Sequence, residues 1–166
     1  MLVAAMNPCP CGYFGDRVRA CRCSPQQIRQ YQGKISGPLM DRIDLHIEVP
    51  SVKYRALSGK ESGESSETIK NRVATTREIQ KRRFHRDGLA CNARMTEKQI
   101  KEFCAIGDES HNLIEMAIEK LGLSARAINR ILKVSRTIAD LENREKIEAP
   151  HVAEAIQYRS LDRSLI

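Results

Sequence analysis

The 166-residue chain is long enough for one domain, or for one domain with a small module. Its charged fraction of 30% is ordinary for a water-soluble protein, and no apolar run reaches the ~20 residues that a bilayer-spanning helix requires. The apolar start at residues 1–6 has no basic leader and stops at Asn7 and Pro8, which is too early for a signal peptide. We therefore expect a cytoplasmic protein that does not enter the membrane.

The first third of the chain is predicted to contain short elements around a loop. Residues 2–6 form an apolar run that ends at a turn dipeptide, which is typical of a short buried strand. A loop rich in Cys, Pro, Gly and Arg follows over residues 8–25, and residues 26–34 allow one or two helical turns. Residues 35–42 favour a turn and a short helix. Residues 45–49 alternate apolar and polar side chains, which indicates a second strand.

The remainder of the chain is predicted to be helical. Thr96 and Gln99 form a capping box, in which each side chain satisfies the free backbone N–H of the other. Ser124 is placed to cap the most amphipathic helix, and Pro150 falls in the first turn of the last one, where its missing N–H costs nothing. The expected helices cover residues 67–84, 96–105, 108–121 and 124–141, and one more begins near 149.

These elements divide the chain into three parts. Residues 1–57 are a short α/β piece with a Cys-rich loop, residues 58–66 are a polar linker, and residues 67–166 are a bundle of four or five helices. The fold class predicted by this division is mainly α, with a partial α/β segment before the helical bundle.

The net charge of +7 is unevenly distributed. Residues 67–91 hold seven Lys and Arg against three Asp and Glu, whereas residues 92–166 hold twelve of each sign. A local excess of this kind is either a nucleic-acid contact, a solvated helix face, or a contact to an acidic neighbouring subunit. The candidate nucleic-acid contacts are Lys70, Arg72, Arg77, Lys81, Arg82, Arg83 and Arg86.

Four of the six cysteines lie within fifteen residues: Cys9, Cys11, Cys21 and Cys23. In a cytosolic protein such a cluster favours a metal site over disulfides, and four thiolates suit a closed, structural Zn²⁺ site. Four cysteine ligands would leave no open position for catalysis. The spacing of one residue inside each pair is less usual than two, so reduced cysteines in a loop remain the alternative.

Three stretches together resemble one family. They are Met6-Asn7-Pro8-Cys9-Pro10-Cys11-Gly12 after an apolar run, residues 34–44 with Leu39-Met40-Asp41-Arg42-Ile43-Asp44, and residues 123–141 beginning Leu123-Ser124-Ala125-Arg126-Ala127. In order and spacing they resemble the C-terminal part of the magnesium-chelatase-like AAA+ ATPases, in particular the ComM/YifB competence-protein group. The resemblance implies that the helical bundle is the lid of an AAA+ module.

The resemblance also implies roles for three residues. Asn7 matches the polar sensor that orients the attacking water, and Arg42 matches the arginine finger that reaches the γ-phosphate in a neighbouring subunit. Arg126 matches the second sensor arginine at the start of a lid helix. The ordinary alternatives are a turn residue for Asn7, a surface ion pair for Arg42 and a solvated side chain for Arg126. The implied cofactors are ATP and Mg²⁺.

The chain has no Gly-x-x-x-x-Gly-Lys-Ser/Thr sequence and no apolar strand that ends in paired acidic residues. We therefore expect it to be inactive alone and to work with the N-terminal remainder of its own AAA+ module in a homo-oligomeric ring. The resemblance implies a parallel sheet in which the strand that carries the phosphate-binding loop lies between residues 2–6 and 45–49. Without that strand these two segments would have unpaired edges. This predicts poor order over residues 1–57, while residues 67–166 fold independently.

Three functions fit these observations. The first is a DNA-remodelling motor of competence or recombination, whose affinity for DNA falls steeply with salt. The second is an ATPase subunit of a metal chelatase, and the third is a non-enzymatic DNA-binding domain that contains zinc. Salt-dependent DNA binding separates the second from the others, and ATPase activity of the parent protein separates the first from the third.

Overall fold

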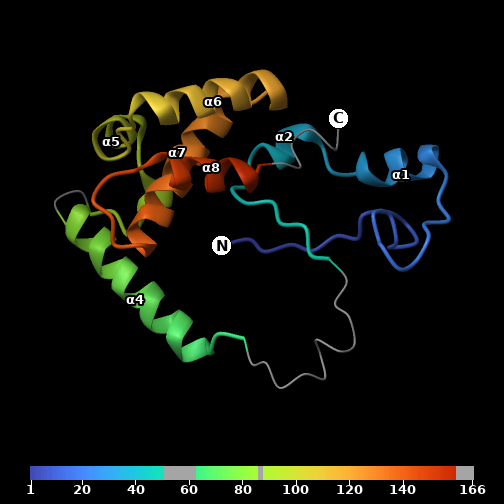
Figure 1. Cartoon of the computed structure of the whole chain (residues 1–166), viewed down its shortest axis with the longest axis horizontal. Coiled ribbons are helices and arrows are strands. Elements are labelled where there is room, and N and C mark those ends of the chain that lie inside the picture. The colour runs from blue at the N-terminus through green and yellow to red at the C-terminus, as the bar shows by residue number, and fades with distance from the viewer. Residues whose placement is uncertain (51–62, 86–87, 160–166) are drawn as a thin grey trace.

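The computed structural model describes residues 1–50, 63–85 and 88–159. A bundle of helices lies at one side of the molecule, and a thinner N-terminal part extends from it (Figure 1). No helix in these ranges is long and apolar enough to cross a membrane. The helices are α1 (Pro25–Gln32), α2 (Gly37–Met40), α4 (Ser66–Arg83), the 3₁₀ turn η1 (Asn92–Arg94), α5 (Glu97–Phe103), α6 (Asp108–Leu121), α7 (Ala125–Leu141) and α8 (Ala149–Gln157).

The predicted helical bundle is confirmed, and its boundaries follow from local capping. The Ser124 side chain accepts a hydrogen bond from the backbone of Ala127 at the start of α7, and Thr96 and Gln99 form the expected capping box before α5. Gly122 ends α6 with a φ of +64°, a left-handed conformation that glycine adopts without strain. The predicted linker lies mostly outside the described residues, as does Arg86.

The two predicted strands are wrong for the described part of the chain. Residues 2–6 and 45–49 are extended but form no strand pairing, and apolar side chains such as Val3 and Val49 are more than 80% exposed. The alternation of apolar side chains is a local signal, whereas a strand also needs a partner for its backbone groups. No described segment supplies that partner.

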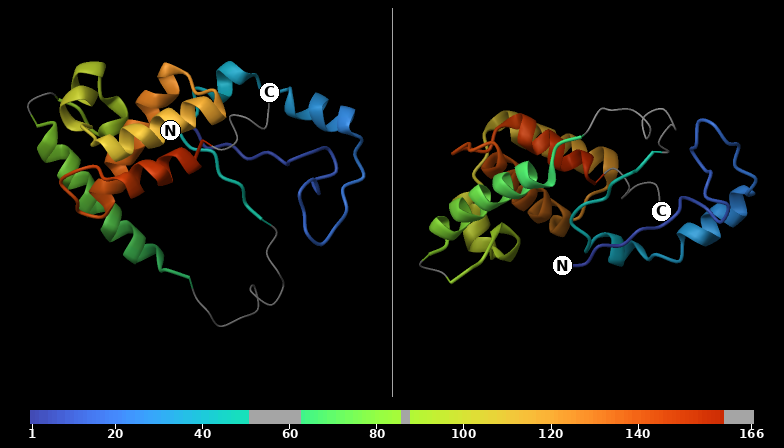
Figure 2. Two further views of the ribbon diagram at one scale, coloured as in Figure 1. Left: turned by 45° about the horizontal axis from the view of Figure 1, so that its top comes forward. Right: turned by 90° about the horizontal axis from the view of Figure 1, so that it is seen from below.

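α7 is the centre of the bundle. It packs against α4, η1, α5 and α8, and α6 packs against α8 (Figure 2). Its buried side includes Ile131, Ser135 and Ile138, and Ala139 is fully buried. The core continues into Phe84, whose ring meets that of Phe103 edge-on at 5.6 Å between centroids.

A buried carboxylate ties the elements together. The Asp140 side chain on α7 accepts hydrogen bonds from both terminal nitrogens of Arg83 at 2.7 and 2.5 Å and from Asn92 Nδ2 at 2.8 Å. Arg136, one turn earlier, donates to the same carboxylate at 3.1 Å and to the carbonyl oxygens of Arg144 and Glu145 at 2.6 and 2.7 Å. One buried anion therefore joins α4, η1, α7 and the turn that follows α7.

Removal of this anion leaves two guanidinium groups facing each other, one of them on the almost fully buried Arg136. We expect Asp140→Ala to lower the free energy of unfolding of the chain by about 3–5 kcal/mol, the usual cost of breaking a buried ion pair. Glu78→Ala, which breaks the exposed pair with Lys81, should cost less than about 1 kcal/mol. Urea titration followed by circular dichroism measures both, and equal losses would contradict the account.

Candidate functional site

The segment around α2 docks onto the helical bundle through its backbone. The His46 backbone N–H donates to Tyr158 O at 2.8 Å, and the Arg159 guanidinium donates to the carbonyl oxygen of Ile43. The His46 ring is buried and lies 3.2 Å from Met40 O. These contacts place Arg42, which lies between them in sequence, at the edge of the lid.

Asp41 joins this segment to the start of α7. Its Oδ1 accepts a hydrogen bond from Ser124 Oγ at 2.9 Å, and its Oδ2 accepts one from Arg126 at 3.3 Å. A second cation, Arg159, lies 3.7 Å from Oδ1. Ser124 and Arg126 at the start of α7, together with Arg159 just after α8, therefore surround the Asp41 carboxylate with one hydroxyl and two guanidinium groups. Such a helix start is also a suitable place for a phosphate.

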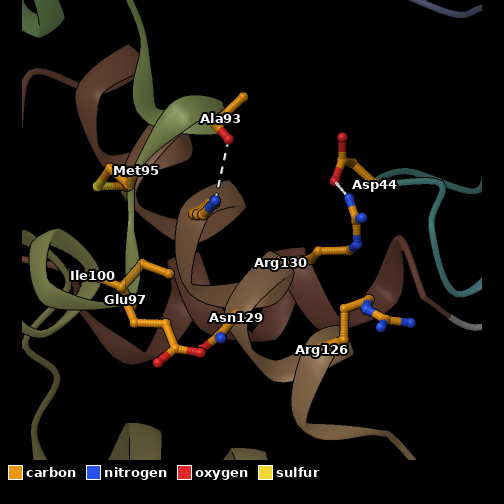
Figure 3. A pocket seen from close by; sticks show the side chains of 9 residues that line it. Asp44, Ala93, Met95, Glu97, Ile100, Arg126, Asn129 and Arg130 are labelled. Atoms are coloured by element: carbon orange, nitrogen blue, oxygen red, sulfur yellow. Dashed lines mark hydrogen bonds and ion pairs between the residues drawn. The ribbon is translucent and has the colours of Figure 1, made fainter. Parts of the chain in front are cut away.

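A second ion pair lies one turn further along α7. Arg130 donates to Asp44 Oδ1, and the side chains of Arg126 and Arg130 point to the same side of the helix (Figure 3). Lys133 follows after another turn and donates to Ala93 O at 3.1 Å. The three cations line a cavity of about 260 Å³ together with Asp44, Ala93, Met95, Glu97, Ile100 and Asn129.

The three residues proposed from the family resemblance are not all brought together. Arg42 is exposed and donates to Pro38 O at 2.9 Å, so its guanidinium lies at the surface of the α2 segment. Asn7 is exposed in the N-terminal part, with its side-chain amide beside Gly12. Within the described chain, no hydrogen bond joins Asn7 to either arginine.

The four clustered cysteines meet in space. Their sulfur atoms all lie within 4.8 Å of one another, and three of the separations are 3.4 Å (Cys9 to Cys11), 3.7 Å (Cys9 to Cys21) and 3.6 Å (Cys11 to Cys21). A zinc–sulfur bond of about 2.3 Å gives about 3.8 Å between two sulfurs of a tetrahedral site. The donor set and its dimensions therefore fit a structural Zn²⁺ ion.

The electrostatics of the thiols also fit a cation. Hydrogen bonds from the backbone of Arg22 and Tyr13 lower the pKa of the Cys11 thiol to about 6. Burial, together with the neighbouring thiols, raises the pKa of Cys23 to about 12. Four thiolates in such close contact repel one another, so without a cation some sulfurs keep their protons. A divalent ion removes this conflict.

Six of the seven basic residues in the candidate nucleic-acid set lie in the described ranges, and their environments differ. Lys70, Arg77 and Lys81 are exposed on α4 and lie on one stripe, because spacings of seven and eleven residues return to nearly the same helix face. Arg72 is exposed but forms a bidentate pair with Glu64, and Arg82 is exposed near the helix end. Arg83, with only 15% of its side chain exposed, is bound to Asp140.

Sequence analysis did not select Asp41, Asp44, Arg130 and Lys133. The signal that could have found the two cations is their spacing from Arg126, because positions four and seven residues further along a helix share a face. The two aspartates flank Arg42 at close range, but their partners are more than 80 residues away in sequence. Only the folded chain shows that they pair with α7.

Comparisons with known proteins find matches to both parts of the chain. Residues 1–57 match the family of magnesium chelatase subunit ChlI, and residues 63–159 match the ChlI C-terminal family. The competence protein ComM of Haemophilus influenzae is 45% identical over 99% of the chain, and YifB of Escherichia coli K12 is 42% identical over 99%. The chain spans 31% and 32% of the lengths of these two relatives.

Both matches are to magnesium chelatase subunit ChlI, and together they cover the cysteine loop, the α2 segment and the helical lid. The chain belongs to the magnesium chelatase ChlI C-terminal family and is related to the AAA+ ATPases through its similarity to ComM.

Proposed function

We propose that the chain supplies the sensor and finger arginines of an AAA+ ATPase whose phosphate-binding loop and Mg²⁺ ligands lie in the N-terminal remainder of the same module. The observation that carries this proposal is the anion-binding start of α7, where Ser124 and Arg126 hold the carboxylate of Asp41. That carboxylate occupies the position in which we place a phosphate oxygen of bound ATP.

The Asp41–Arg126 contact is weak enough for ATP to replace it. The Arg126 side chain is 57% exposed and its nitrogen lies 3.3 Å from the carboxylate, so the pair contributes about 0–1 kcal/mol to stability. A phosphate carries more charge and accepts a bidentate hydrogen bond from guanidinium. Arg126 would then report the presence of the γ-phosphate to α7, and α7 would carry the change to the rest of the lid.

We assign to Arg42 the contact with ATP that is bound to a neighbouring subunit. It is exposed on the segment that is anchored to the lid at His46 and Arg159, so it can face a neighbouring subunit of a homo-oligomeric ring. A guanidinium aimed at the transferred phosphoryl group stabilises the charge of the transition state. Asn7 keeps its proposed role as the water-orienting sensor, which requires the strand pairing that the N-terminal remainder would supply.

The proposed parent enzyme is a DNA-remodelling motor. Its support is the stripe of Lys70, Arg77 and Lys81 on α4, whose residues 66–75 are all exposed. Such a stripe contacts backbone phosphates and gives salt-dependent affinity. Arg72 and Arg82 are also exposed, but they lie on other faces of α4, Arg72 nearly opposite the stripe. Arg83 is left out of the proposed DNA contacts because its guanidinium is bound to Asp140.

A zinc ion would have a structural role. Cys9 is the only buried residue in the first 34 positions, so this part of the chain has almost no apolar core. The four sulfurs take the place of such a core.

The metal-chelatase alternative shares the ATPase chemistry but predicts no response to DNA.

The ATPase proposal is tested on the longer protein that includes the phosphate-binding loop. We expect single-stranded or branched DNA to stimulate ATP hydrolysis, and Arg126→Ala to lower the rate about 100-fold or more, because a charge-stabilising donor is lost from the active site. Lys120→Ala, on the exposed surface of α6, is the matched control and should leave the rate unchanged. A normal rate in Arg126→Ala would refute the sensor assignment, and a rate that ignores DNA would favour the chelatase alternative.

The zinc proposal predicts one Zn²⁺ per chain by elemental analysis. Cys21→Ser should abolish metal binding and accelerate hydrogen exchange over residues 8–34, while the helices of the lid keep their protection, because the lid has its own core. Cys91→Ser, which changes a cysteine outside the cluster, should retain the metal. Full metal content in Cys21→Ser would show that the cluster is not the site.

A further inference from the structure

Residues 8–34, which we call the cysteine unit, bury little apolar surface. Their aromatic side chains are exposed or partly exposed. The unit contains three of the seven aromatic residues of the chain, namely Tyr13, Phe14 and Tyr31. Phe14 is 50% exposed at the tip of the loop between the two cysteine pairs. One exposed Phe is unremarkable alone, so its surroundings decide what it can do.

Those surroundings are cationic. The unit has five basic residues and one acidic residue, Asp16, so its net charge is +4 with neutral thiols. Four thiolates with one divalent ion add −2 and leave it at +2. The Asp16 carboxylate accepts hydrogen bonds from the backbone of Val18 at 2.7 Å and Arg19 at 2.8 Å. These bonds form a tight turn that follows Phe14 in the chain. Arg17 lies in this turn, three residues after Phe14 in the chain, and is exposed.

Cations and rings are paired in the unit. The guanidinium of Arg19 lies over the Tyr13 ring at 5.3 Å from its centroid and donates to the Tyr13 hydroxyl at 2.7 Å. Lys34 Nζ lies 5.6 Å from the centroid of the Tyr31 ring. These contacts hold positive charge against aromatic faces at the surface. Among the described residues, the cation–ring contacts of the unit involve both tyrosines but not Phe14.

The unit is also accessible. It extends away from the helical bundle in all three views (Figures 1 and 2), and α1 has no buried residue. A hydrogen bond from Gln32 Nε2 to Pro8 O at 3.0 Å joins the end of α1 to the start of the loop. The loop and α1 are therefore connected at both ends of the unit.

We infer that the cysteine unit binds single-stranded nucleic acid, with a base stacked on Phe14 and with Arg17, Arg19 and Arg22 at the phosphates. An aromatic ring stacks on the face of any base that is not paired, and arginines beside it neutralise the backbone. A base inside a duplex offers no free face to Phe14. This inference rests on the DNA role in the proposed function, and it adds the contacting element and the strandedness of the ligand.

The test uses the 166-residue chain loaded with Zn²⁺ and fluorescently labelled oligo(dT) or a duplex of equal length, followed by fluorescence anisotropy. Phe14→Leu keeps an apolar side chain but removes the ring, and should weaken oligo(dT) binding about tenfold while duplex binding is unchanged. Phe14→Tyr should restore the affinity. The matched control, Lys70→Ala with Lys81→Ala on α4, should weaken both ligands to a similar extent.

A low zinc content would reveal that Phe14→Leu has lost its fold. A second variant then tests the inference. Arg17→Ala, at an exposed position, should weaken oligo(dT) binding and lower the slope of log affinity against log salt by about 0.7. Wild-type oligo(dT) affinity in both variants would overturn the inference. If the α4 variant still weakens duplex binding in that case, the DNA role stands without the cysteine unit. ATP hydrolysis by the longer protein tests the nucleotide role separately.

Discussion

The buried carboxylate of Asp140 holds the lid in one arrangement. It is shared by Arg83 from α4 and Arg136 from α7, and Asn92 of η1 donates to it as well. Apolar burial is non-directional, so alone it fixes the register of two helices less strictly than hydrogen bonds do. A hydrogen-bonded ion pair that satisfies each partner fixes the register of α4 against α7.

The two ends of the chain are stabilised by different physics. The lid buries Ile114, Ile131 and Val152 among other apolar side chains, so it has a continuous core. The cysteine unit has Cys9 as its single buried residue and depends on contacts between sulfurs. In the proposed function, the packed helices carry the nucleotide signal, and the cysteine unit presents its charged and aromatic side chains to a ligand.

Local signals in the sequence predicted much of this structure. Ser124, Thr96 and Gly122 act within their own helical turns, so the helix boundaries followed from residue type, and the four cysteines were already neighbours in the chain. Pairings across the fold could not be predicted in this way. Arg83 was expected at the surface because its partner lies 57 residues away, and the expected strands failed because strand pairing is a property of two segments.

The central claim is that Arg126 acts on the nucleotide of its own subunit while Arg42 acts on that of a neighbour. The most direct test mixes Arg42→Ala and Arg126→Ala subunits of the longer protein in equal amounts and measures ATP hydrolysis. Each variant alone should be nearly inactive, and the mixture should recover about a quarter of the wild-type rate, the statistical fraction of subunit junctions with both arginines intact. A mixture as inactive as its components, or full activity in Arg42→Ala alone, would contradict the account.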